Sequence, residues 1–349
     1  MTAKDWQNIL ESLHADEEMS FEISRRIMEI ILSGERSQDE IADFLRAHTA
    51  KGGTATEVSG FISAMYAHAA PISISGRAVD TVGTGGDGFH TINISTASAI
   101  VSSAAGAKVI KHGNRAATSQ SGAADVLEAL GIKVDLNGEQ VSYLFSEIGI
   151  GFCFAPIFHG AMRHAAGARK SLGFPTIFNI LGPLSNPAQP TSYAIGVAKE
   201  EMFPIVAEVL RERGVDALVF RGRDGLDEIS LSAPTQIYLI SKKKSRLTEI
   251  DPIVWGIARA PIESLRGGSA QENATHMREI LAGKSGAMRD VVLLNSAATL
   301  LAYHGIDAEI SDSELEKKFA EELKRAEKAI DTGAATQLLE VWRDRSHRV

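Results

Sequence analysis

The chain has 349 residues, of which 44% are hydrophobic and 23% are charged, and its formal net charge is −8. Such a chain can bury a large core in one α/β domain or in two domains, and its acidic balance argues against nucleic acid or an anionic membrane as a partner. Its single cysteine, Cys153, excludes an intrachain disulfide and fits a reducing, cytoplasmic compartment, where we expect a buried apolar thiol.

The first seventy residues predict helices. Apolar side chains recur there at helical spacing, and Ser20 is the expected N-cap of a helix that ends at Gly34. We expect no signal peptide in this polar, acidic start, and no apolar run reaches membrane-spanning length. A turn region at 71–76 predicts a boundary between a helical domain at 1–72 and an α/β domain at 73–349.

Beyond this boundary strands alternate with helices, which implies βαβ units and a mostly parallel central sheet. The expected strands are 78–82, 107–111, 149–155, 193–197 and 217–221. The helices expected between them are 95–105, 122–130, 137–148 and 200–213. Residues 228–251 predict an antiparallel excursion, and the last hundred residues are expected to be mostly helical, with an apolar helix at 290–304 buried in the core.

Four glycines follow the first expected strand within six residues, at positions 83, 85, 86 and 88, and Asp87 lies among them. Glycines let backbone N–H groups approach an anion without obstruction by side chains, and the start of the next helix adds a favourable dipole. This strand, turn and helix therefore predict a binding site for a phosphorylated ligand. The alternative is a plain turn between a strand and a helix.

The glycine loop matches neither of the two common phosphate-binding motifs. The spacing of three glycines fits the dinucleotide fingerprint, but the window at 102–108 holds no acid for a ribose hydroxyl. In that motif the helix also begins at the last glycine, whereas here Ser95 or Thr96 is the better N-cap. A P-loop would close with Gly-Lys-Ser/Thr, which does not follow this loop.

Two charged clusters follow later strands. The segment KHGNR begins at Lys111, at the end of the second expected strand, and Asp227 and Glu228 follow the fifth. Adjacent carboxylates repel each other unless a cation lies between them, and Mg²⁺ binds one or two carboxylates together with phosphates. Ligands of parallel sheets bind beyond the carboxyl ends of the strands. The clusters therefore predict a strand-end site for a phosphate- or pyrophosphate-bearing substrate with Mg²⁺, the alternatives being a solvated basic turn and an exposed acidic turn.

Residues 156–190 combine basic side chains with a Gly/Pro-rich turn. This composition predicts a crossing between the two domains, and ligands commonly bind where domains meet. A structural loop with solvated basic side chains is the alternative.

With these motifs in this order, the chain resembles the anthranilate phosphoribosyltransferases over nearly its whole length. The segments that carry the resemblance are GTGGD with NIST, KHGNR, RKSLGFPTIFNILGPLSNP and the pair Asp227-Glu228. The resemblance implies a small N-terminal helical domain, joined by a returning segment around 170–192, and a large α/β domain with a mostly parallel central sheet. This is the nucleoside phosphorylase/phosphoribosyltransferase-like arrangement.

The resemblance also implies an activity. The phosphoribosyl group of 5-phosphoribosyl pyrophosphate (PRPP) would pass to the amine of anthranilate with release of pyrophosphate, a step of tryptophan biosynthesis. About two Mg²⁺ ions, a cytoplasmic location and a homodimer formed through the helical domain are implied with it, and neither nucleic acid nor a membrane is an expected partner.

Site residues carry over by the same resemblance. The positions that match PRPP-binding residues are Gly83, Gly86, Asp87, Thr91, Asn93, Ile94, Ser95, Thr96, Lys111, His112, Gly113, Asn114, Arg115, Ala116, Ala117, Thr118, Ser119 and Ala123. The positions that match anthranilate-binding residues are Gly83, Asn114, Arg169, His112, His159 and Pro183. The metal-binding positions are Ser95, Asp227 and Glu228. Lys111 would offer its charge to a phosphate, and the planar fork of Arg169 suits the anthranilate carboxylate.

No general base is assigned. An aromatic amine is already neutral at pH 7, so we expect catalysis by positioning and by stabilisation of the departing charge. His112 is a candidate base, but a binding or orienting role is expected for it. The chain departs from the family pattern at Ile92, where Phe is common, and at 120–123, where QSGA replaces KSGS, so that contacts from Gln120 or Ala123 would come from the backbone.

Two other functions stay open at this point. A nucleoside phosphorylase of the same fold would need a nucleobase pocket, whereas KHGNR and the region of Arg169 suit anthranilate better. A related protein that binds nucleic acid would be basic, whereas this chain is acidic and keeps the carboxylate pair.

Overall fold

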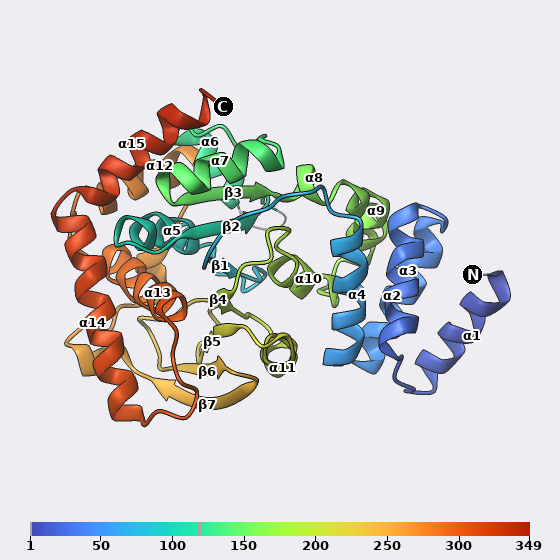
Figure 1. Ribbon diagram of the computed structural model, residues 1–349. Helices are drawn as coiled ribbons and strands as arrows, with labels where there is room; N and C mark the ends of the chain where they lie inside the picture. Colours follow the sequence, from blue (N-terminus) through green and yellow to red (C-terminus); the bar gives the residue numbers. More distant parts are fainter. Residues whose placement is uncertain (1, 117–119) are drawn as a thin grey trace.

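The computed structural model describes residues 2–116 and 120–349, and the described chain begins with four helices (Figure 1). These are α1 (Ala3–His14), α2 (Phe21–Ser33), α3 (Gln38–Lys51) and α4 (Ala55–Ala67). The Ser20 hydroxyl accepts from the Ile23 N–H at the start of α2, and Gly34 ends that helix in the left-handed conformation with φ 75°. The cap and the stop predicted for this helix are thereby confirmed.

Seven strands form one sheet in the order β3-β2-β1-β4-β5-β6-β7. Their bounds are β1 (Val79–Gly83), β2 (Val109–Gly113), β3 (Ile150–Phe154), β4 (Ser192–Gly196), β5 (Asp216–Gly222), β6 (Thr235–Ser241) and β7 (Lys244–Ile250). The first five pair in parallel, while β6 and β7 are antiparallel, which confirms the mostly parallel sheet and the antiparallel excursion. Chain order runs outward in both directions from the central pair β1 and β4, and such a reversal favours ligand binding at the carboxyl ends of these two strands.

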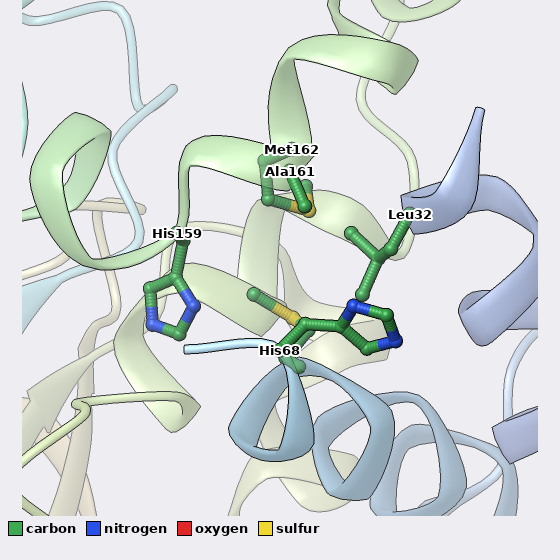
Figure 2. A pocket seen from close by; sticks show the side chains of 6 residues that line it. Leu32, His68, His159, Ala161 and Met162 are labelled. Atoms are coloured by element: carbon green, nitrogen blue, oxygen red, sulfur yellow. The ribbon is translucent and has the colours of Figure 1, made fainter. Parts of the chain in front are cut away.

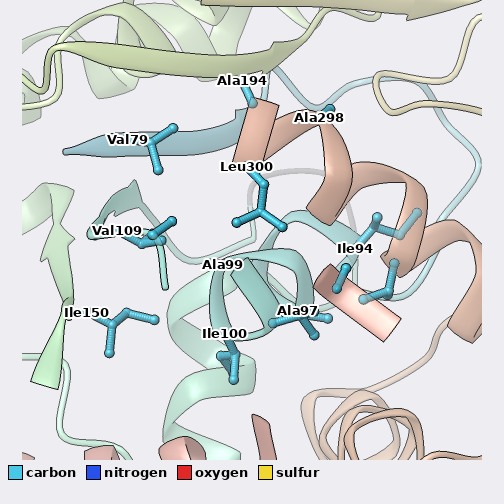
Figure 3. Close-up of a cluster of buried hydrophobic side chains, with 14 of the residues drawn as sticks. Val79, Ile94, Ala97, Ala99, Ile100, Val109, Ile150, Ala194, Ala298 and Leu300 are labelled. Carbon is cyan, nitrogen blue, oxygen red and sulfur yellow. The ribbon is translucent and has the colours of Figure 1, made fainter. Parts of the chain in front are cut away.

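Helices cover one face of the sheet with a large apolar core. Figure 3 shows side chains of β1, β2, β3 and β4 meeting those of α5 and α13, and Figure 1 places α14 and α15 outside them. The helices on this side are α5 (Ile94–Ala104), α12 (Ala270–Leu281), α13 (Ala287–His304), α14 (Asp312–Asp331) and α15 (Ala334–Ser346). Helices α6 (Ala123–Ala129) and α7 (Gly138–Ile148) lie near β3. Cys153 of β3 is a buried free thiol, as expected.

The second core joins the N-terminal helices to the other face of the sheet. Side chains of β4, β5 and α11 (Phe203–Arg213) belong to the same apolar cluster as those of α2, α3 and α4. None of the helices in the described part of the chain is both long and apolar enough to cross a membrane.

The segment predicted as a crossing is largely helical. After β3 it forms α8 (Ala155–Phe158), the short 3₁₀ turn Gly160–Met162, α9 (Arg163–Leu172) and α10 (Phe178–Leu184). Helix α9 packs against α3, where the Gln38 amide donates to the His164 carbonyl and accepts from the Ala168 N–H, both at 2.7 Å. The chain thus returns to the N-terminal helices already at Arg163, earlier than the expected 170–192, before it passes through α10 to β4.

Candidate active site

The glycine loop begins where β1 ends and is tied to the end of β4. The Thr84 N–H donates to the Gly196 carbonyl at 3.0 Å, and the Thr84 hydroxyl accepts from the Ala198 N–H at 3.0 Å. Gly85 and Gly86 then adopt φ of 69° and 81°, a conformation that side chains disfavour. The loop therefore lies at the sheet position where the strand order reverses.

Two glycines of this region leave room for Asp227. A Cβ added to Gly83 would overlap the Asp227 Oδ2, and one added to Gly196 would overlap the Asp227 carbonyl oxygen. The same Asp227 oxygen, Oδ2, accepts from the Gly85 N–H at 2.6 Å. The predicted phosphate loop and the predicted metal pair are thus in direct contact.

Helix α5 begins one residue before the expected N-cap. Its N-cap is Asn93, so the prediction of Ser95 or Thr96 was wrong. Asn93 makes no capping bond because its amide donates to the Ser121 carbonyl at 3.0 Å and accepts from Asn273 at 2.9 Å. The first turn of α5 therefore receives no cap from Asn93, and the Glu228 carboxylate lies against its Ser95 N–H, which shows that this helix start accommodates negative charge.

Lys111 is a buried cation in the middle of β2, which continues to Gly113. Its ammonium donates to the Thr81 carbonyl at 2.5 Å and to the Ser95 hydroxyl at 3.2 Å, and the side chain is 1% exposed. Burial lowers the pKa of Lys111, while the negative charges of Asp80 and Glu228 oppose that shift. A buried cation next to the start of α5 is well placed to meet a phosphate.

Asp227 and Glu228 form a buried carboxylate pair. Burial raises the pKa of both groups well above the ordinary range, with Asp87 adding to the effect on Asp227 and Asp227 adding to that on Glu228. Within residues 2–116 and 120–349 the side chains form no cluster of three His, Cys, Asp or Glu groups ready to hold a metal. A pair of carboxylates that repel each other fits Mg²⁺, which takes few protein ligands and completes its shell with water and phosphate.

The opposite side of β2 meets α10 through His112. Its Nδ1–H donates to the Gly182 carbonyl at 3.0 Å, whereas its Nε2 has no partner among the described residues. Burial, with His159 nearby, lowers the pKa of His112 to about 3, so that the ring is neutral at pH 7. The His159 ring lies 5.3 Å from it, centroid to centroid, and donates from Nε2 to the Ser185 carbonyl at 2.8 Å.

His159 also lines a small pocket between the N-terminal helices and the returning segment. Figure 2 shows its ring facing Leu32 of α2 and His68 after α4, with Ala161 and Met162 on the other wall. This pocket lies beside the helices and is separate from the residues that line the glycine loop.

Two predicted binding arginines differ in their surroundings. Arg169 of α9 is exposed, and its guanidinium lies 5.8 Å from the ring centre of Phe178, the first residue of α10. Arg115 is instead paired with Asp125 at 2.9 Å and with Glu128 at 2.6 Å. Its guanidinium would have to leave both carboxylates before it could bind a ligand.

Several predicted PRPP-binding positions offer backbone rather than side chain. Ile94 and Thr96 are buried at the start of α5, at 1% exposure each. Gly113 is the last residue of β2, Asn114 and Ala116 follow it, and Pro183 is buried in α10 next to Gly182, the partner of His112. The predicted positions Ala117, Thr118 and Ser119 lie outside the described residues.

The sequence did not indicate the buried bridge of Asp80 and Asn186. The Asn186 amide donates to Asp80 at 2.9 Å and to the Ile110 carbonyl at 2.8 Å, and Asp80 also accepts from the His112 N–H. Burial raises the pKa of Asp80 to about 6, against the pull of Lys111 and Asn186. The available signal in the sequence was an acidic residue in the middle of an apolar strand. The hydrogen bonds of Asp80 and Asn186 join β1, β2 and the turn after α10 next to His112.

Comparison with known proteins places these features in a family. Residues 75–336 match the glycosyl transferase family a/b domain, and residues 7–69 match the helical bundle domain of the same family. The chain is 48% identical to the anthranilate phosphoribosyltransferase of Arthrobacter sp. (strain FB24), over 97% of this chain and 95% of that one.

Solved structures of the Saccharomyces cerevisiae anthranilate phosphoribosyltransferase share the fold. The complex with PRPP and Mg is 27% identical with a TM-score of 0.88, and the complex with 4-fluoroanthranilate is 25% identical with a TM-score of 0.87. Each comparison covers 100% of this chain and 99% of the other.

Proposed function

Because the chain belongs to the anthranilate phosphoribosyltransferase family, we propose that the strand-end site built by β1, β2, α5 and the Asp227-Glu228 turn is its active site. The enzyme transfers the 5-phosphoribosyl group from PRPP to the amine of anthranilate and releases pyrophosphate, in the pathway to tryptophan. The observation that carries the location is the direct bond between the Gly85 N–H and the Asp227 carboxylate, which joins the phosphate loop to the carboxylate pair.

The glycine loop and the start of α5 bind PRPP in this proposal. Backbone N–H groups of the loop and of the first turn of α5 donate to phosphate oxygens, and Lys111 adds a buried positive charge. Gly83, Gly86, Asp87, Thr91 and the residues that follow β2 complete the surroundings of the ribosyl pyrophosphate.

Asp227, Glu228 and the Ser95 hydroxyl would hold magnesium. When bound, Mg²⁺ supplies positive charge to the departing pyrophosphate. We propose about two ions; the buried carboxylate pair with its raised pKa values supports at least one such site, because an added divalent cation relieves the repulsion between the two groups.

Anthranilate binds on the side of α10. Arg169 pairs with the anthranilate carboxylate, and His112, His159 and Pro183 border the aromatic ring together with Asn114 and Gly83. His112 is neutral at pH 7, since its pKa lies at about 3, and its role is to orient the acceptor rather than to bind its charge. The imidazole of His112 is not protonated near pH 7, so in this proposal the rate enhancement comes from positioning of the substrates.

The proposal extends to the domains and to their assembly. The helical domain spans 1–72 and the α/β domain 73–349, and two copies associate through the helical domain, where the apolar side chain of Ile23 is 44% exposed on α2. A cytoplasmic location fits the single free thiol and the substrates.

A steady-state assay with the purified chain tests the function. Anthranilate fluorescence is followed with anthranilate, PRPP and Mg²⁺, and with each component left out in turn. We expect loss of fluorescence only when all three are present. Nucleoside and inorganic phosphate form the control reaction, and turnover of that pair without turnover of anthranilate would overturn the assignment.

A further inference from the structure

The carboxylate pair lies in an irregular loop that is held by hydrogen bonds both before and after the pair. Residues 223–234 connect β5 to β6 without regular secondary structure. Before the pair, the Gly222 N–H of β5 donates to the Leu226 carbonyl at 2.9 Å. The backbone before Asp227 is therefore fixed to the end of β5. The orientation of the two carboxylates then depends on the contacts that fix the backbone immediately after Glu228.

Asn295 of α13 binds both the backbone N–H and the backbone carbonyl of Ile229, the residue that follows Glu228. The Ile229 N–H donates to the Asn295 Oδ1 at 2.9 Å, and the Asn295 Nδ2 donates back to the Ile229 carbonyl at 3.2 Å. The remaining amide hydrogen bonds to the Val291 carbonyl at 2.9 Å within the helix. These partners use both ends of the amide, so the side chain has one orientation in which every bond is made.

The clamp is deeply buried. Asn295 is 1% exposed and Ile229 is fully buried, and a buried backbone N–H or carbonyl without a partner is costly. An apolar residue at position 295 would leave two such groups unpaired one residue beyond Glu228. The loop would then shift until water or another donor reached them, and the carboxylates would shift with it.

We propose that Asn295 is a positioning residue for the metal pair, fixing Asp227 and Glu228 through the backbone of Ile229. The inference rests on the proposed function, which assigns these two carboxylates to Mg²⁺. Removal of a group that orients a metal ligand without touching the metal commonly lowers metal affinity by about tenfold to a hundredfold.

The test compares Asn295→Ala with Ser296→Ala in the full chain. Ser296 is the next residue of α13, is fully buried, and donates only within its helix, to the Val292 carbonyl at 2.7 Å. Binding of Mn²⁺ alone is measured by electron paramagnetic resonance, and the Mg²⁺ concentration for half-maximal transfer is measured separately. We expect Mn²⁺ affinity to fall at least about tenfold in Asn295→Ala and to change less than about twofold in Ser296→Ala.

Equal Mn²⁺ binding by Asn295→Ala and the parent, or an equal loss in both variants, would overturn the proposal. If Asn295→Ala does not fold, Asn295→Gln, which keeps the amide but displaces it by one methylene, is judged by the same criterion. A parent that transfers phosphoribosyl groups but binds no Mn²⁺ removes the metal assignment and this inference with it. A parent that binds Mn²⁺ without any transfer contradicts the proposed activity and leaves the Asn295 comparison decisive.

Discussion

Single residues in this site are constrained mainly by the close contact between the glycine loop after β1 and the loop that carries Asp227 and Glu228. Gly83 closes β1 against Asp227, and the adjoining Gly85 donates to the same carboxylate. In such close packing, one added methyl group at Gly83 would displace the Asp227 carboxylate. Arg169 represents the opposite case, because the residue is exposed and its side chain belongs to neither apolar core.

Gly83→Ala is expected to lower kcat/KM by about a hundredfold, since the new Cβ must displace the Asp227 carboxylate and, in the proposed site, would misplace the ion and the pyrophosphate with it. Gly160→Ala is the matched control, because its added Cβ would meet only the Arg163 guanidinium at an ordinary 3.7 Å. Steady-state kinetics over a range of Mg²⁺ concentrations measures both. If Gly83→Ala kept the kcat/KM of the parent, the Asp227 carboxylate would be able to move away from residue 83 without loss of activity, and the prediction would be wrong.

Arg169→Ala is expected to raise the KM for anthranilate by about tenfold to a hundredfold, the worth of a lost charge-assisted bond, while the KM for PRPP changes little. Arg169→Lys should restore only part of the loss because an ammonium cannot pair with both carboxylate oxygens in one plane. The neighbouring Lys170→Ala serves as the control. The role of Arg169 fails if both substrates keep their parental KM.

Whole elements show where sequence patterns suffice and where they do not. The strands and the long helices of the α/β part were predicted within a few residues because apolar periodicity and turn residues agree there. Helix α9 gave no periodic signal, since its buried side chains are only Ala165 and Ala168, and α10 contains Gly182 and Pro183, which indicate a turn. The motifs predicted which residues meet at the strand ends, whereas the Asp80-Asn186 bridge and the Asn295 clamp depend on tertiary packing that no local pattern encodes.

The junction of α3 and α4 predicts an acid-sensitive helical domain. Glu57 is fully buried and accepts hydrogen bonds from Met19 and Thr54 and from the side chains of His48 and Lys51. Burial alone would raise the pKa of Glu57, but these bonds outweigh it and lower the pKa from 4.5 to about 2. The stabilisation is therefore complete above pH 4.5 and is lost as the pH falls from 4.5 towards 2.

Glu57→Gln should accordingly cost about 3 kcal/mol in the free energy of unfolding at pH 6, and the difference from the parent should shrink towards zero near pH 2. Urea unfolding between these pH values measures it. Glu29→Gln, whose carboxylate makes partly exposed pairs with Arg25 and Arg26, is the control and should cost less than about 1 kcal/mol. A gap between parent and Glu57→Gln that stays constant with pH contradicts this account.

Across the whole molecule, the two cores meet at the sheet. The larger core lies between the sheet and the C-terminal helices, and the other runs without interruption from β4 and β5 into the N-terminal helices. Helix α10 belongs to this second core, and its Gly182 carbonyl accepts the hydrogen bond from His112. The proposed association through the helical domain would therefore act on the same core that positions α10 against His112.

Sedimentation of the whole chain is expected to give twice the monomer mass. Ile23→Glu places a charge on the exposed apolar side chain of α2 and should weaken the dimer by at least about tenfold. Ile253→Glu, at a residue that is 55% exposed after β7, is the control and should sediment like the parent. Unchanged association of Ile23→Glu would contradict a role of this face of α2 in the dimer.

The return of the chain to the N-terminal helices has a consequence during synthesis. Gln38 of α3 bonds to both His164 and Ala168 of α9, so the first four helices meet α9 only after the intervening strands β1 to β3 have been synthesised, and they meet α10 and α11 later still. The distance from Ala67 to Arg163 is roughly 100 residues, a delay of roughly 5–20 s at ordinary elongation rates. A nascent chain stalled within this interval would carry an uncovered apolar helix surface, which makes it a natural client for chaperones that bind such surfaces.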